Sequence, residues 1–194
     1  YLSVAGLKGH IQELDFHELN GHTKPEEVER LLPLFDNGND VGLITEAGLP
    51  AVADPGSQLV KLCHRHNIEV VPCSGPSSLM LALMGSGLNG QSFAFLGYIP
   101  AKTDERRQAL KSIEKHSASA HQTKIMIETP YRNDSLFADI LNVCQGSTEL
   151  CVAADITMPD AYIMTKTVAE WKRYMAGKES IIGKRPCVFL ILAH

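Results

Sequence analysis

Two glycine- and proline-rich turns carry the residue types best suited to binding a small ligand. The segment TEAGLPAVADPG, residues 45–56, follows the apolar run 41–44 and is expected to leave the carboxyl end of a buried strand. Acids beside Gly48 favour positive charge, and the glycine lets the backbone approach a ligand closely. The segment PCSGPSS, residues 72–78, joins a strand to a helix whose free N–H groups attract an anion, although a plain connection capped by Ser74 explains it equally well.

The segment ETPYR, residues 128–132, places an acid, a proline turn and an arginine where a predicted strand gives way to a helix. Open α/β sheets bind ligands at the carboxyl ends of their strands, so this position is typical of a binding site. A surface ion pair between Glu128 and Arg132 explains the pattern equally well.

Basic residues gather at and along one predicted helix. They are Lys102, Arg106, Arg107 and Lys111. Such residues can contact the phosphates of a nucleic acid, but with two acids nearby a solvated helix face is the more frequent meaning of the pattern.

Two motif matches fail their structural requirements. GSGLNG, residues 85–90, matches the dinucleotide fingerprint, which must end a strand and open a helix. Here it closes a predicted helix and precedes a strand, so it is predicted to be a helix cap and linker. In HELNGH, residues 17–22, the histidines are five apart with a glycine between them, so one helix face does not present both and we expect no metal site.

The composition is that of an ordinary globular protein. Of 194 residues, 44% are hydrophobic and 21% charged, and no apolar run reaches the roughly eighteen residues of a membrane helix. Five scattered cysteines favour reduced thiols in a cytoplasmic protein over disulfides or a zinc site. Residues 1–91 carry 5 Lys and Arg against 11 Asp and Glu, and residues 92–194 carry 13 against 11. That weak basic balance permits nucleic-acid binding but favours an ordinary charged surface.

Short apolar runs alternate with helix-like segments along the chain. Strands are predicted at residues 10–19, 40–45, 68–72, 93–98, 124–128, 149–156 and 187–192. Helices are predicted at 25–36, 55–66, 76–84, 103–115 and 132–144, the first ended or kinked by Pro33. The alternation indicates an α/β fold with a parallel sheet, and the small-residue break at 85–92 predicts two domains, residues 1–90 and 91–194.

Several of these motifs occur together in the order seen in one family. They are FHELN (16–20), TEAGLPAVADPG (45–56), PCSGPSS (72–78), FLGYIPAK (95–102), RRQALKSIE (106–114) and ETPYR (128–132). In this order they resemble the ribosomal-RNA cytidine ribose 2′-O-methyltransferases of the tetrapyrrole-methylase superfamily. The likeness covers roughly residues 10–145, and the ordered set is far more specific than any single motif.

The resemblance implies two α/β domains, with a mostly parallel sheet in residues 1–90, a mixed sheet in residues 91–194 and a cofactor cleft between them. It implies S-adenosylmethionine as the cofactor and S-adenosylhomocysteine as the product, without a metal, in an enzyme that is typically a homodimer. The residues implied to bind the cofactor are Thr45, Glu46, Ala47, Gly48, Pro50, Ser74, Gly75, Pro76, Ser77, Ser78 and Pro130.

The resemblance also implies methyl transfer to a ribose 2′-hydroxyl of small-subunit ribosomal RNA in the cytoplasm. Glu128 is the candidate base for that hydroxyl. The candidate RNA-binding residues are Lys102, Arg106, Arg107 and Arg132. Two alternatives stay open: methylation of a tetrapyrrole-like small molecule, and a catalytically silent paralogue that binds RNA or a protein partner.

The sequence departs from the family pattern at three places. It starts in what is expected to be the helix after the first strand, so it resembles a fragment without that strand and its donor-binding loop. ADITM, residues 154–158, stands where Arg-Glu-Leu-Thr-Lys is expected, and GKRP, residues 183–186, stands where a Lys-Gly-Glu turn is common. These departures weaken the assignment to ribosomal RNA more than the assignment to methyl transfer.

Overall fold

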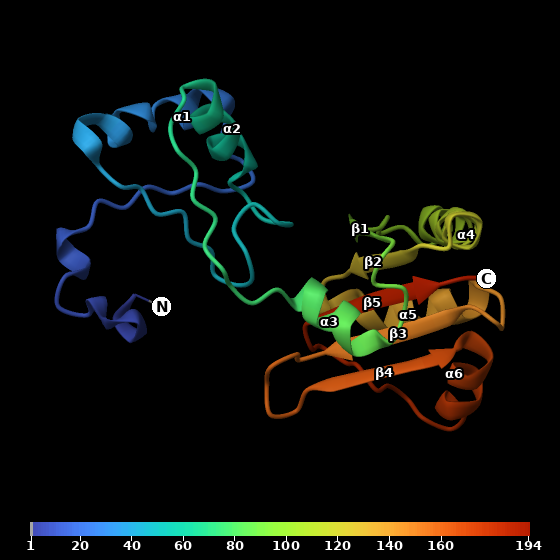
Figure 1. The fold of residues 1–194 in the computed structure, drawn as a ribbon. Coiled ribbons are helices and arrows are strands. Elements are labelled where there is room, and N and C mark those ends of the chain that lie inside the picture. Colours follow the sequence, from blue (N-terminus) through green and yellow to red (C-terminus); the bar gives the residue numbers. More distant parts are fainter. Residues whose placement is uncertain (1) are drawn as a thin grey trace. The chain divides into compact units, whose positions relative to one another are not determined.

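The computed structural model describes residues 2–194, which form two compact units, one ending at Gly75 and one spanning Pro76–His194. Figure 1 shows the elements of each unit. The boundary precedes the predicted one at 90/91, because helix α3, Ser78–Ser86, packs on the sheet of the C-terminal unit. A helix belongs to the unit that buries its apolar face, and the small-residue break after α3 marks only the end of the helix.

The N-terminal unit is built from short helices around a small apolar core. Its elements are η1 (Ser3–Leu7, a π-helical turn), η2 (Ile11–Glu13, 3₁₀), α1 (Pro25–Glu29), η3 (Leu32–Gly38, 3₁₀) and α2 (Ser57–Arg65). The break between α1 and η3 beside Pro33 confirms the predicted interruption of that helix. Val28 of α1 is buried against Leu59, Leu62 and Cys63 of α2, so the two helices share one core.

The sheet predicted for residues 1–90 is not formed by the described part of the N-terminal unit. The segments predicted as strands, 10–19, 40–45 and 68–72, take part in no strand pairing. A strand is stable only when a neighbouring strand satisfies its backbone hydrogen bonds, and these segments have no such neighbour among the described residues. Some of their apolar residues, Leu43 and Ile68 among them, pack against the helical core instead. Others, such as Ile44 and Val71, are exposed, so the apolar runs predict burial only in part and do not predict the sheet.

The C-terminal unit contains the mixed sheet expected for this half of the chain. Its strands are β1 (Phe93–Tyr98), β2 (Thr123–Ile127), β3 (Glu149–Ala154), β4 (Tyr162–Thr167) and β5 (Cys187–Leu192), in the order β1-β2-β5-β3-β4. Only the β1–β2 pair is parallel, and the other pairs are antiparallel. Its remaining helices are α4 (Thr103–Ala120), η4 (Pro130–Arg132), α5 (Asn133–Val143) and α6 (Val168–Met175). Among the described residues, no helix has the length and apolarity needed to cross a membrane.

Alternating residues of the central strands fill two apolar cores on opposite faces of this sheet. Phe189 and Ile191 of β5 lie in the core that α4, α5 and α6 cover, together with the buried Trp171. Val188 and Leu190 lie in the core that α3 covers, on the other face (Figure 1). Burying each such side chain stabilises the fold by about 1.5–3 kcal/mol, and all six residues of β5 are buried.

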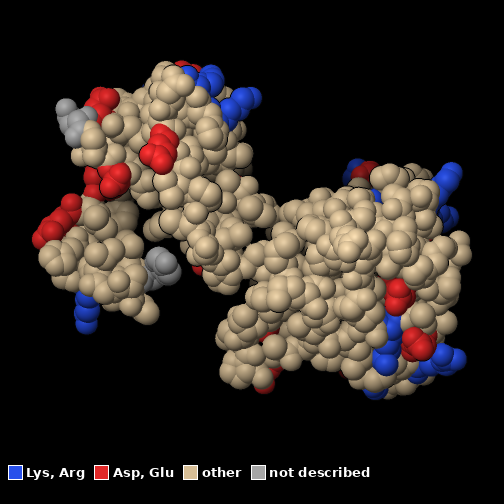
Figure 2. Space-filling model, in the orientation of Figure 1, with Lys and Arg blue, Asp and Glu red and all other residues tan. Residues whose placement is uncertain are grey.

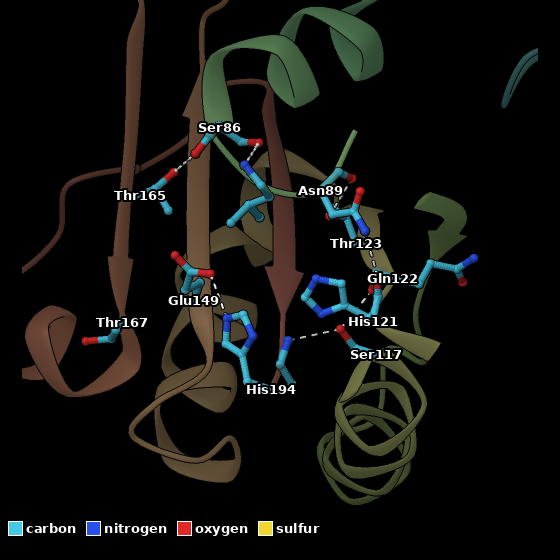
Figure 3. A network of polar contacts seen from close by, with 12 residues as sticks. Ser86, Asn89, Ser117, His121, Gln122, Thr123, Glu149, Thr165, Thr167 and His194 are labelled. Atoms are coloured by element: carbon cyan, nitrogen blue, oxygen red, sulfur yellow. Dashed lines mark hydrogen bonds and ion pairs between the residues drawn. The ribbon is translucent and has the colours of Figure 1, made fainter. Parts of the chain in front are cut away.

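The segment GSGLNG ends α3 and begins the link to β1. Gly87 caps the helix with a left-handed φ of 73°, so the prediction of a helix cap and linker is confirmed. The Ser86 hydroxyl donates to the Leu83 carbonyl at 2.8 Å. The Asn89 amide donates to the carbonyl of His121 at 2.7 Å, which ties the linker to the end of α4 (Figure 3).

The strands of the sheet end at two opposite edges, and polar contacts join the elements at the edge where β5 ends. Along the edge shown in Figure 3, the Ser117 hydroxyl accepts from the Ala193 N–H at 3.0 Å and donates to the Gln122 carbonyl at 2.8 Å. His194 contacts the Glu149 carboxylate at 3.0 Å along the same edge. These polar contacts join α4 to the carboxyl end of β5. Their positions indicate a structural role for this edge.

The opposite edge gathers the carboxyl ends of three strands. Tyr98 of β1 pairs with Ile127 of β2, and Ile127 pairs with Val188 of β5. Ala154, the last residue of β3, pairs with Cys187. Because β5 runs antiparallel to both of its neighbours, the carboxyl ends of β2 and β3 lie on either side of the start of β5. Side chains that follow these strands are thereby brought to one place.

Candidate functional site

A pocket of about 350 Å³ opens at this carboxyl edge of the C-terminal unit. The polar and aromatic residues that line it include Ser78, Tyr98, Glu128 and Asp155, with Pro130 beside them. They come from the start of α3, from the last residue of β1 and from the segments after β2 and β3. A concave site of this size with a few converging polar groups is the usual form of a small-ligand site.

Glu128 follows β2 directly and is 5% exposed. Its Oε1 atom accepts hydrogen bonds from the Thr129 N–H at 2.6 Å and from Nε and Nη2 of Arg132 at 3.0 and 2.7 Å. Its Oε2 atom is buried and has no hydrogen-bond partner. A buried oxygen without a partner costs about 1–3 kcal/mol, a cost that a bound group with a proton to donate would remove.

Asp155 is the second acid of the pocket and belongs to the segment ADITM. It has a left-handed φ of 48°, and its N–H donates to the Pro186 carbonyl at 3.0 Å. Its carboxylate lies 3.7 Å from Nε of Arg185, whose guanidinium also donates to the backbone carbonyls of Ile182 and Ile181. ADITM and GKRP, the two segments that depart from the family pattern, therefore contact each other through Asp155, Arg185 and Pro186. Asp155 and Pro186 also line the pocket.

Cys187 also lines the pocket, at the start of β5. Burial raises the pKa of its thiol to about 12. The thiol is therefore protonated at neutral pH, and Cys187 serves as apolar lining rather than as a nucleophile.

The predicted cofactor loop of residues 45–50 lies in the N-terminal unit. Thr45 and Pro50 are half-buried, while Glu46, Ala47 and Gly48 are exposed. Gly48 has a φ of 76°, and nothing lies within 4 Å of the position that a Cβ would take. Its backbone is therefore open to a ligand. A glycine is favoured here by the left-handed φ of the turn, and not by neighbouring atoms that would exclude a side chain.

The second predicted cofactor segment meets the first within the N-terminal unit. A Cβ added at Gly75 would lie 3.0 Å from Cδ2 of Leu49, so the backbone at Gly75 packs closely on the 45–50 loop. Ser74 before it and Pro76 after it are exposed. Two segments that are distant in the sequence thus contribute to one surface.

The segment continues into the C-terminal unit as the start of α3. Ser77 is the N-cap of α3, and its hydroxyl accepts from the N–H of Met80 at 3.5 Å. Ser78 is the first helical residue and lines the pocket. The other free N–H groups of this first turn favour an anionic group. The N-cap of this helix is therefore Ser77 and not Ser74, the residue expected for a plain connection.

The four predicted RNA-binding residues have different environments. Lys102 is exposed and pairs with Glu105 at 3.1 Å, and Arg132 is partly exposed beside Glu128. Arg107 is 47% exposed along its side chain. Figure 2 shows basic side chains over α4 and α6 on the visible face of the C-terminal unit.

Arg106 has a structural role instead. Its side chain is 5% exposed, its Nε donates to Asp139 of α5 at 2.7 Å, and its Nη1 donates to the Ala101 carbonyl at 2.9 Å. Burial by itself raises the pKa of Asp139, but hydrogen bonds from Arg107 and Arg106 outweigh it and hold the pKa below its ordinary value. This stabilisation is present above the ordinary pKa of an aspartate and is lost as the pH falls through the lowered one.

Sequence reasoning did not select several residues of this site. Tyr98 lies in the motif FLGYIPAK and Asp155 in ADITM, and both line the pocket. Tyr98 is the last residue of β1 and Asp155 follows β3 directly, and a position at a strand's carboxyl end is the same signal that selected Glu128 after β2. That signal becomes decisive only once the strand order is known, because the three strand ends are far apart in the sequence.

The chain belongs to the family of Tetrapyrrole (Corrin/Porphyrin) Methylases, whose family model matches residues 8–172. It is 33% identical over 162 residues to a protein of Vibrio cholerae named ribosomal RNA small subunit methyltransferase I. The matched residues cover 84% of this chain and 55% of that protein. The protein of the same name from Thermotoga maritima is 36% identical over 144 residues, 74% of this chain and 61% of the relative. The chain thus spans about half the length of the curated relatives it matches.

Solved structures share the fold at low sequence identity. The methyltransferase CobJ has a TM-score of 0.57 and 14% identity, over 96% of this chain and 80% of that one. The cobalt precorrin-4 methyltransferase CbiF has a TM-score of 0.52 and 19% identity, over 89% and 72%. These likenesses support the α/β fold expected from the sequence.

Replacing Asp139 by Ala is expected to lower the free energy of unfolding by about 3 kcal/mol, because the buried Arg106 loses its partner. Urea denaturation measures the loss. Arg107→Ala is the matched control, since it removes a half-exposed partner of the same carboxylate and is expected to cost about 1 kcal/mol or less. Equal losses in the Arg106→Ala and Arg107→Ala variants would contradict the structural role of Arg106.

Proposed function

We propose that this protein is an S-adenosylmethionine-dependent methyltransferase that modifies a ribose 2′-hydroxyl of small-subunit ribosomal RNA. Family membership supports methyl transfer, and the names of the relatives support the RNA acceptor. The observation that carries the proposal is the Glu128 carboxylate, which lines the pocket with a buried oxygen that has no partner. An oxygen in that condition is suited to accept a proton from a bound hydroxyl.

The proposed donor-binding residues form two groups. In the N-terminal unit they are the exposed loop of residues 45–50 and the adjoining Ser74 and Gly75. In the C-terminal unit they are residues 76–78 at the start of α3 and Pro130. The acid of the loop suits the positive charges of S-adenosylmethionine, and a helix N-terminus suits its carboxylate. When bound, the donor supplies an electrophilic methyl group and leaves as S-adenosylhomocysteine.

Glu128 is the residue assigned to the acceptor hydroxyl. As the hydroxyl oxygen forms its bond to the methyl carbon, the O–H proton passes to Oε2 of Glu128, and the product is a neutral ether. Oε1 is occupied by the donors of Thr129 and Arg132, which hold the carboxylate in a fixed position. A base held in position before the reaction lowers the entropic cost of alignment.

Lys102, Arg107 and Arg132 are the proposed phosphate contacts, because each keeps a substantial part of its side chain exposed. Arg106 is left out of this set, since its guanidinium is buried against Asp139. From the proposed ribosomal RNA acceptor we infer a cytoplasmic location. The homodimer implied by the family resemblance stays a prediction.

Transfer of labelled methyl groups onto purified small ribosomal subunits tests the acceptor. Subunits from a strain lacking the gene are expected to accept label, and subunits from the wild-type strain are not, because their site is already methylated. Equal labelling of both overturns the ribosomal assignment. Labelling of a tetrapyrrole instead supports the small-molecule alternative, and absence of S-adenosylmethionine binding in calorimetry supports a silent paralogue.

Glu128→Gln is expected to lower kcat about 10²- to 10⁴-fold while leaving affinity for S-adenosylmethionine unchanged, because the amide keeps the shape but does not accept the proton. Rates on subunits from the deletion strain and calorimetry measure the two quantities. Asp155→Asn is the matched control, since it neutralises the other acid of the same pocket. A similar loss of kcat in both variants contradicts the specific role of Glu128.

Gly48→Val is expected to weaken binding of S-adenosylmethionine roughly tenfold, equivalent to ~1.4 kcal/mol, because a branched residue is strained in the left-handed region. Gly177→Val is the matched control, with a φ of 77° against 76° and the same open space around the added Cβ. Gly177 follows α6, outside the proposed donor loops. Calorimetry that finds the same donor affinity in both variants contradicts the role of the loop.

A further inference from the structure

Tyr131 is a large aromatic residue that the fold leaves in solvent. It is 80% exposed, although the residues on both sides of it belong to the site. Pro130 before it lines the pocket, and Arg132 after it donates two hydrogen bonds to Glu128. All three residues form the short turn η4, so Tyr131 is fixed in the backbone beside the proposed base.

A second exposed ring lines the pocket itself. Tyr98 ends β1, lines the pocket and is 59% exposed. Met158, from the segment after β3, also lines the pocket and is 60% exposed. Single exposed apolar residues are ordinary, but several at the rim of one pocket mark a binding surface.

Positive charge accompanies the ring of Tyr131. The Lys184 ammonium lies 5.3 Å from the centre of the ring, within the range of a cation–π contact. The Arg132 side chain is 40% exposed and pairs with the buried Glu128 at 2.7 Å. Asp134, the exposed acid nearest in the sequence, accepts a hydrogen bond from Ser180 at 2.7 Å. The Tyr131 ring therefore has the Lys184 ammonium beside it and the partly exposed Arg132 next to it in the sequence.

We propose that Tyr131 stacks on an unpaired base of single-stranded RNA while Lys184 contacts the phosphate next to that base. Exposed aromatic rings beside basic side chains are the features by which proteins bind single-stranded nucleic acid. The inference rests on the proposed function in one respect, the choice of RNA as the acceptor. The stacked nucleotide is a neighbour of the one whose ribose reaches Glu128. The lysine of GKRP thereby gains a role in positioning the RNA.

Fluorescence anisotropy with a labelled, cytidine-containing single-stranded RNA oligonucleotide tests the stacking. Tyr131→Ala is expected to weaken binding about 10- to 100-fold, and Tyr131→Phe to bind within about twofold of the wild type, because stacking uses the ring and not the hydroxyl. Phe93→Ala is the matched control, since Phe93 is 39% exposed at the start of β1, away from the pocket. Equal binding by Tyr131→Ala and the wild type overturns the proposal.

The salt dependence of RNA binding by Lys184→Met tests the phosphate contact independently. Each phosphate contact to a single strand contributes about 0.7 to the slope of log affinity against log salt, so the variant is expected to lower the slope by about that amount. An unchanged slope overturns the role of Lys184. Tighter binding to duplex RNA than to the single strand, or Tyr131-dependent binding of a porphyrin without RNA binding, overturns the choice of ligand.

Calorimetry with S-adenosylmethionine on the same variants separates this inference from the proposed function. Tyr131→Ala is expected to keep the donor affinity of the wild type while losing RNA affinity. Donor binding and methyl transfer without any dependence on Tyr131 overturn the stacking alone. RNA binding that depends on Tyr131 in a protein without donor binding overturns the methyltransferase proposal and leaves the stacking intact.

Discussion

The arrangement of the C-terminal unit depends on strand β5, which lies between β2 and β3 and pairs antiparallel with both. All six of its residues are buried, and the first five alternate between the two cores. Because the side-chain period of a strand is two, a shift of β5 by one residue would exchange the two faces and empty both cores. The register is therefore fixed, and with it the meeting of the strand ends at the pocket.

The edge of the sheet where β5 ends carries structural contacts, and the edge where β2 and β3 end carries the candidate site. Serine and histidine contacts hold the edge where β5 ends, and few of its polar groups lack partners. At the other edge the structure leaves Oε2 of Glu128 and Oδ1 of Asn133 buried without a partner. Buried polar atoms in that state are uncommon, and they concentrate where a ligand completes the hydrogen bonding. Of these two residues Glu128 lines the pocket, so its unpaired Oε2 supports the pocket as a candidate site more strongly than the pocket's shape does.

Particular residues show which features of the fold the sequence patterns predict and which they do not. The apolar runs at 93–98 and 187–192 predicted strands that the structure contains, because each has a strand beside it: β1 pairs with β2, and β5 pairs with β2 and β3. The run at 40–45 predicted a strand that has no neighbouring strand to bond with among the described residues, and periodicity does not reveal whether such a neighbour exists. Arg106 and Arg107 are adjacent and chemically identical, and both bond Asp139 of α5, yet only the Arg106 side chain is buried between α4 and α5.

The sequence by itself determined the family, the mixed α/β character of the C-terminal half and the glycine turn at Gly48, because these depend on local residue types and their order. Only the tertiary structure placed Tyr98, Glu128 and Asp155 around one pocket and separated the structural arginine from the exposed one. Proximity depends on strand order and register, which arise from long-range hydrogen bonds and packing. No local stretch of sequence contains both partners of such contacts.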